Sequence, residues 1–176
     1  MILFLDFDGT LHPNWTLHQR GDRQVAVPYS GPWFVEAPIL ASIIEPYSKH
    51  IDIVISSWWA YTRSISEIAE LLPQGIASRI TGSIWLSEQL ARYRDESMSR
   101  YRSIQIWLDH HDLTLADDWI ALDDDAYGWP SKLRDRLIHA QGTLGNPTVR
   151  AALCSRLADM LGPPIPRTRC DSDCPD

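Results

Sequence analysis

Two aspartates one residue apart follow the first apolar segment of the chain, and their position predicts chemistry. Met1–Leu5 is apolar without alternation, which is typical of a strand buried on both faces of a parallel sheet. Asp6 and Asp8 would then lie at the carboxyl end of that strand, where open parallel sheets bind their ligands. Because neighbouring carboxylates repel each other unless a cation or a shared proton relieves them, the pair indicates a metal site.

Two further strand-like segments also end in polar residues. Ile51–Ile55 is followed by Ser56 and Ser57, and Trp119–Leu122 is followed by Asp123–Asp125. The carboxyl ends of parallel strands meet at one edge, so hydroxyl and carboxylate groups should gather there. Carboxylate oxygens suit Mg²⁺, which keeps part of its coordination shell for water and phosphate. One aspartate could attack phosphorus and form an aspartyl phosphate, while the other transfers protons.

Strand-like and helix-like segments alternate along the chain, and this alternation predicts the fold class. Helices are expected over Phe34–Tyr47, Ile65–Leu72, Tyr101–His111 and Asn146–Leu161, and weaker strands over Ile76–Thr81 and Leu137–Ala140. Parallel strands need crossovers, and right-handed crossovers place helices on both faces of a sheet. We therefore expect a doubly wound, mainly parallel α/β sheet.

The remaining segments set the domain organisation. Residues 11–33 have no clear period and are expected to form a loop or flap, and residues 82–99 a long irregular loop. The interval from Leu11 to His50 must already contain a crossover helix, which leaves little room for a cap domain. A single domain is expected over residues 1–166, followed by a disordered tail over residues 167–176.

Composition limits the function classes. With 176 residues, 44% of them hydrophobic, the chain can bury one substantial core, and it has no apolar segment long enough to span a membrane. The three cysteines match neither a secreted disulfide framework nor a zinc site, so a cytoplasmic protein with no membrane partner is expected. The net charge of −7 disfavours sequence-blind binding to nucleic acid. The eight tryptophans predict core packing, with stacking on a ligand as the alternative.

The segment Asp6-Phe7-Asp8-Gly9-Thr10 resembles the first motif of the haloacid dehalogenase (HAD) superfamily of phosphohydrolases. The resemblance implies a Rossmann-like core in which Asp6 is the nucleophile and Asp8 the general acid and base. It implies a Mg²⁺ ion bound by Asp6, Asp8 and Asp124, with Asp123 as a supporting ligand. Dehalogenases of the superfamily lack the second aspartate, so Asp8 argues against dehalogenase chemistry.

The later motifs of the superfamily follow in the same order. Ser56 resembles the hydroxyl residue that binds the transferring phosphoryl group, and Ser57 is the near alternative. Arg100 matches the third-motif cation, with Arg102 and Arg94 as fallbacks. Most members have lysine there, but arginine would still neutralise the phosphoryl group.

Within the superfamily, the chain is most similar to the small bacterial HAD domain associated with RNA-repair proteins. That similarity depends on the order and spacing around Gly82, Arg100, Trp107 and the triple aspartate.

Other polar and aromatic residues near these motifs have simpler interpretations. His12 and His18 are expected to be flap residues rather than metal ligands. Trp58 and Trp59 cannot both face the site if the chain is extended there, so one is expected to line the pocket and the other to pack.

The expected function is Mg²⁺-dependent hydrolysis of a phosphate monoester through an aspartyl phosphate. The substrate would be a phosphorylated small molecule or macromolecule, with a nucleotide or an RNA end among the candidates. One alternative is a phosphate-binding pseudoenzyme or interaction module with the same fold. Another is a signalling receiver domain, but a receiver needs a phosphorylated aspartate on a central strand and a late lysine. This chain has its acidic pair on the opening strand, and Lys132 is the only lysine after the triple aspartate.

Overall fold

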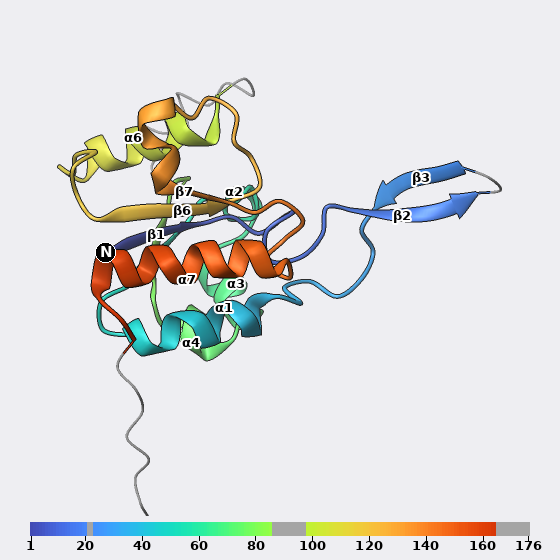
Figure 1. The fold of residues 1–176 in the computed structure, drawn as a ribbon, viewed down its shortest axis with the longest axis horizontal. Helices are drawn as coiled ribbons and strands as arrows, with labels where there is room; N and C mark the ends of the chain where they lie inside the picture. Colours follow the sequence, from blue (N-terminus) through green and yellow to red (C-terminus); the bar gives the residue numbers. More distant parts are fainter. Residues whose placement is uncertain (21–22, 86–97, 165–176) are drawn as a thin grey trace, which may run out of the picture.

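A five-stranded parallel sheet forms the centre of the molecule (Figure 1). The computed structural model describes residues 1–20, 23–85 and 98–164. The strands lie in the order β5-β4-β1-β6-β7, so the opening strand is central. Their bounds are β1 Ile2–Leu5, β4 Asp52–Ile55, β5 Ile80–Ser83, β6 Trp119–Asp123 and β7 Leu137–His139.

Helices cover both faces of this sheet, as expected for a doubly wound fold. In Figure 1, α1, α4 and α7 lie on one face and α6 on the other. The helices are α1 Ala37–Ile44, α2 Trp59–Thr62, α3 Ile65–Glu70, α4 Gln74–Ala77, α6 Arg100–His110 and α7 Pro147–Leu161, with the 3₁₀ turns η1 Glu45–Tyr47 and η2 Ser131–Arg136.

The unalternating apolar sequence of β1 is explained by burial on both faces. Leu3 and Leu5 belong to the core cluster that includes residues of α1 and α7. Phe4 points to the other face, where its ring lies 5.3 Å from that of Trp107 in α6 and 5.9 Å from that of Trp119. Both sides of the strand are therefore apolar because both sides carry a core.

The termini of two helices follow the local sequence signals. In α7 the side chain of Asn146 accepts a hydrogen bond from the Thr148 N–H, and Pro147 occupies the first turn. Pro38 lies in the first turn of α1. This helix begins at Ala37 rather than at Phe34, because Phe34 has a positive φ of 56° and packs its ring 5.0 Å from that of Phe7.

The strand expected over Ile76–Thr81 is wrong in its first half. Gln74–Ala77 form a single helical turn, α4, and β5 runs from Ile80 to Ser83. Ile76 is fully buried in the core cluster that also contains residues of α1. A short apolar pair fits a helical turn as well as a strand, and packing against α1 decides between the two.

Residues 11–33 contain regular structure that their sequence pattern does not predict. Strands β2 Trp15–Arg20 and β3 Arg23–Pro28 pair antiparallel, with Trp15 opposite Pro28. This hairpin projects from the body of the molecule (Figure 1), and antiparallel backbone pairing joins its two strands. An antiparallel hairpin therefore stands where the sequence pattern predicts a loop or flap.

The described ranges contain no cap domain beyond this hairpin. Most of the expected loop over residues 82–99, with its fallback Arg94, lies outside the described residues, and so does the expected tail over residues 167–176.

No helix in the described part of the chain is long and apolar enough to cross a membrane.

Candidate active site

The ends of three neighbouring strands bring the predicted site residues together. The Asp6 N–H donates to the Leu122 carbonyl at 3.0 Å, and the Ser56 N–H donates to the Leu5 carbonyl at 2.8 Å. Sheet pairing thus continues one residue beyond β1 and β4. Asp6 therefore lies beside the end of β6, which carries Asp123, and Ser56 lies beside the end of β1 on its other side.

Three carboxylates form one acidic group at this edge. Asp6, Asp123 and Asp124 each offer an oxygen, and these oxygens all lie within 4.8 Å of one another. Asp6 and Asp123 are buried, and Asp124 is partly exposed. An all-oxygen, anionic donor set at this spacing fits Mg²⁺, so these three residues could hold the metal that the motif implies.

Arg100 neutralises part of this negative charge. Its Nη2 lies 3.2 Å from Asp6 Oδ1 and its Nε 3.1 Å from Asp123 Oδ2. Its guanidinium group also donates to the Ser56 carbonyl. A cation on the first residue of a helix is unfavourable with respect to the helix dipole, and the two carboxylates offset that cost.

The helix start explains why Arg100 rather than Arg102 reaches the site. The Ser99 hydroxyl caps α6 by accepting a hydrogen bond from the Arg102 N–H at 3.2 Å. The Arg102 side chain is exposed and lies 3.5 Å from Gln105 Oε1.

Burial makes ionisation of these acids unfavourable. Loss of solvent raises the pKa of Asp6 well above its ordinary value, and the nearby Asp123 raises it further, while Arg100 opposes both effects. Burial also raises the pKa of Asp123 to about 6 and raises the pKa of Asp124. A cation bound among these carboxylates would remove this penalty.

Asp8 has different surroundings, although it is two residues from Asp6. His12 Nε2 lies 3.0 Å from Asp8 Oδ1, and the Trp59 Nε1–H donates to Asp8 Oδ2 at 3.0 Å. The Phe34 N–H donates to His12 Nδ1 at 3.5 Å, which assigns the ring proton to Nε2 and makes His12 the donor to Asp8. The hydrogen bond from His12 is the main reason that the pKa of Asp8 is lowered.

These contacts separate Asp8 from the acidic group. Its carboxylate is not among the three that lie within reach of one ion in the described structure. The predicted metal contact through the Asp8 side chain therefore has no support in this arrangement. A proton-transfer role remains compatible with it.

Three hydroxyl groups near the strand ends are buried without a hydrogen-bond partner among the described residues. They belong to Thr10, Ser56 and Ser57. Unpaired buried hydroxyls cost free energy, which makes them candidates for binding a ligand oxygen. Burial does not distinguish Ser56 from Ser57, because both side chains are fully buried.

Gly9 is required by the close approach of Asp124. Its φ is +73°, and a Cβ at this position would collide with the Asp124 carboxylate. Asn14 Nδ2 donates to the same carboxylate at 2.9 Å. Beside these residues lies a pocket of about 380 Å³, also lined by Trp15 and His139. The acidic site therefore opens to solvent next to the base of the hairpin.

Sequence reasoning missed three residues of this site. His12 and Trp59 bind Asp8, and Asn14 binds Asp124. His12 was expected to be a flap residue, and its spacing four residues after Asp8 was the only available signal. Trp59 is buried beside Asp8 while Trp58 is 48% exposed. The condition of the expected division, an extended chain, is not met, because Trp58 has helical backbone angles and α2 begins at Trp59.

One known protein family matches most of the chain. Residues 2–146 match the family described as the HAD domain in Swiss Army Knife RNA repair proteins. No curated protein and no solved structure matches. The matched range includes every candidate site residue discussed above.

Replacement of Asp123 by asparagine should stabilise the metal-free protein at neutral pH. Folding raises the pKa of this acid from 3.8 to about 6, so the folded state binds more protons between these values and loses stability as pH rises through them. Asparagine cannot ionise, yet it can still accept the hydrogen bond from the Asp125 N–H. The melting temperatures of Asp123→Asn and wild type, measured with chelator, should converge near pH 4 and separate above about pH 6. A constant difference at all pH values would contradict the assignment.

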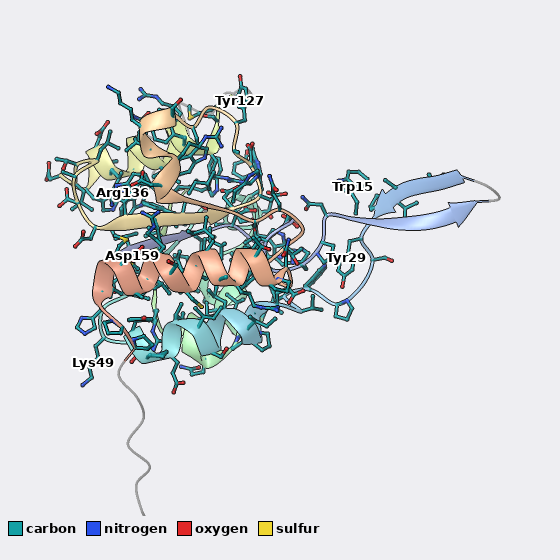
Figure 2. The ribbon with its side chains drawn as sticks, viewed as in Figure 1. Trp15, Tyr29, Lys49, Tyr127, Arg136 and Asp159 are labelled. Carbon is teal, nitrogen blue, oxygen red and sulfur yellow. The ribbon has the colours of Figure 1, made fainter. Side chains whose placement is uncertain are left out.

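Mg²⁺ should raise the melting temperature of the wild type, because an ion that binds only the folded state stabilises it. Asp124→Asn should lose most of this increase, since it removes one carboxylate of the acidic group. Asp159→Asn is the matched control, because Asp159 is exposed on α7 towards the opposite edge of the sheet (Figure 2). An equal Mg²⁺ response in all three proteins would place the ion elsewhere.

Proposed function

The chain belongs to the haloacid dehalogenase superfamily, in the family of HAD domains of Swiss Army Knife RNA repair proteins, and on this premise we propose that it hydrolyses phosphate monoesters with Mg²⁺. The observation that carries the proposal is the environment of Asp6. This carboxylate lies at the end of the central strand, within reach of one ion shared with Asp123 and Asp124, and in contact with Arg100.

In the proposed first step, an Asp6 oxygen attacks the phosphorus of the ester. The bond from phosphorus to the ester oxygen breaks, and the leaving alcohol takes a proton from Asp8. Arg100 holds Asp6 in place and neutralises charge on the phosphoryl oxygens. A buried hydroxyl of Ser56 or Ser57 donates a hydrogen bond to a phosphoryl oxygen.

In the second step, Asp8 accepts a proton from a water molecule, and the water oxygen attacks the aspartyl phosphate. The bond between phosphorus and the Asp6 oxygen breaks, which releases inorganic phosphate, frees the Asp6 carboxylate and returns Asp8 to the protonated form from which the first step began. Mg²⁺ bound by Asp6, Asp123 and Asp124 would supply positive charge against the phosphoryl oxygens.

His12 and Trp59 would position Asp8 for both proton transfers. Each donates to a different oxygen of this carboxylate, so its plane is fixed. Correct orientation of a catalytic group contributes strongly to rate, and misplacement by about 1 Å can cost roughly a hundredfold.

The substrate is proposed to be a phosphorylated small molecule or macromolecule, with a nucleotide or nucleic-acid end included. The open edge beside Asp124 and the absence of a cap in the described ranges both suit a large substrate. The printed name of the matched family supports an RNA end.

The receiver alternative loses its main support. The acidic pair does follow a spatially central strand, so position in the sheet alone does not exclude a receiver. However, the cation at the acids is Arg100, which precedes the acidic pair of β6 in the chain, and Lys132 is exposed on η2. The pseudoenzyme alternative differs only in activity, and the first experiment below decides it.

Purified protein should release phosphate from an aryl phosphate in the presence of Mg²⁺ and lose this activity with chelator. Asp6→Asn should lower kcat by roughly a thousandfold or more, because it removes the nucleophile. Asp159→Asn should retain wild-type activity. If aryl, nucleotide and RNA-end substrates all yield no phosphate above the Asp6→Asn background, the enzyme proposal fails and a pseudoenzyme is favoured.

Trp59→Phe should lower kcat about tenfold with little change in KM, because it removes the N–H that orients Asp8 but keeps an aromatic ring. Trp129→Phe is the matched control, since this buried indole N–H has no hydrogen-bond partner among the described residues. In an Asp8→Asn background the Trp59→Phe change should have almost no further effect. Additive losses would show that Trp59 acts independently of Asp8.

A further inference from the structure

Exposed aromatic side chains surround the candidate active site. Among the described residues, the aromatic side chains that are more than a third exposed have exposures from 48% to 71%, and they are Trp15, Trp33, Trp58, Tyr61 and Tyr127. All five lie in segments that follow the carboxyl ends of β1, β4 and β6. Figure 2 shows Trp15 at the base of the hairpin and Tyr127 on the loop beyond β6. We refer to these five residues as the aromatic rim.

Aromatic residues away from this edge are buried. Tyr47, Trp107 and Trp119 are each at most 7% exposed. Large aromatic side chains normally gain free energy from burial, so their concentration on one exposed edge indicates a binding surface. Stacking on a ligand is the alternative role that the composition indicates for the tryptophans. This exposed edge is where such stacking would take place.

One part of the rim is connected directly to the catalytic carboxylate Asp8. Trp33 packs edge-to-face on Trp59, with ring centroids 5.0 Å apart, and Trp59 donates to Asp8. The guanidinium carbon of Arg63 lies 4.4 Å from the Trp59 ring centroid and 5.8 Å from that of Trp33. This part combines an exposed ring with an exposed cation, which suits a base and its attached phosphate.

A second stack lies next to the buried serines. Trp58 follows Ser57 in the chain, and its ring stacks on that of Trp85 with centroids 4.8 Å apart and an interplanar angle of 24°. Tyr61 contacts the edge of Trp58 at 5.8 Å. The two parts of the rim therefore meet at the start of α2, where Trp59 contacts Trp33 of the first part and the adjacent Trp58 belongs to the second.

The occupant must place a phosphate at Asp6 and flat groups against the rings. Nucleobases have such faces, and exposed aromatic rings bind unstacked bases of single strands. A duplex hides its base faces, and a mononucleotide has one base for two ring platforms. The net charge of −7 weakens attraction to phosphates in general, so stacking would have to supply much of the affinity.

We propose, on the basis of the function proposed above, that the aromatic rim binds the terminal bases of a single-stranded nucleic acid whose end phosphate is the substrate. Trp33 and Trp58 are the stacking platforms, and Arg63 contacts an internal phosphate. The rim thus selects the substrate, whereas the acidic group performs the reaction.

The test compares two kinds of substrate in four proteins. The substrates are a single-stranded pentanucleotide with a terminal phosphate, at the 3′ or the 5′ end, and glycerol phosphate, which has no ring. Wild type should prefer the pentanucleotide in kcat/KM. Trp33→Ala and Trp58→Ala should each reduce this preference roughly tenfold, because each removes one stacking ring. Leu115→Ala, which removes an exposed aliphatic side chain before β6, should keep the preference.

Several outcomes would overturn the rim proposal while leaving phosphate hydrolysis intact. These are an unchanged preference in both tryptophan variants, equal turnover of a blunt duplex, or equal turnover of a mononucleotide. Hydrolysis of glycerol phosphate by wild type reports on the phosphatase activity alone. If nothing is hydrolysed, fluorescence anisotropy of a labelled, phosphorylated pentanucleotide still tests the rim. If wild type and each of the two tryptophan variants bind this pentanucleotide with equal affinity, the rim proposal is rejected. Binding of a protein partner would then be the better explanation for the exposed rings.

Discussion

The arrangement of charge at the carboxyl edge of the sheet constrains the rest of the structure. Parallel pairing of β1 with β6 brings the buried Asp6 and Asp123 together, and their mutual repulsion must be offset. Arg100 contacts both acids, which requires α6 to begin beside the strand ends. Gly9 must lack a side chain because Asp124 occupies the adjacent space. Several local features, including a helix start and a glycine turn, thus depend on the need to hold buried acids in one place.

A second constraint distinguishes the two aspartates of the opening motif. Asp6 enters a buried, acidic environment that raises its pKa, whereas the hydrogen bonds from His12 and Trp59 lower the pKa of Asp8. The tight turn after β1 makes this possible, because Thr10 and Leu11 both donate backbone hydrogen bonds to the Phe7 carbonyl and so turn the chain away from the sheet.

The proposed recognition and the proposed chemistry would occupy different layers of the same edge. Asp6, Asp123 and Arg100 lie at strand ends and on α6, whereas the exposed rings lie on the segments that follow those strands. With no cap in the described ranges, the flanking segments and the projecting hairpin would surround the proposed substrate. Trp59 connects the layers, since it packs against Trp33 and also donates to Asp8.

The sequence by itself determined the central sheet and the acids at its edge. An unalternating apolar segment followed by polar residues requires a strand buried on both faces, and parallel strands must end at a common edge. Tertiary structure decided what local patterns do not encode: that Arg100 rather than Arg102 reaches the acids, that His12 and Trp59 bind the Asp8 carboxylate, and that residues 15–28 contain a hairpin. His12, Asn14 and Trp59 belong to the site only because loops from different strands meet there. Strand and helix periodicity follows from short-range backbone geometry, whereas side-chain partners depend on contacts between distant segments that exist only after the sheet has formed.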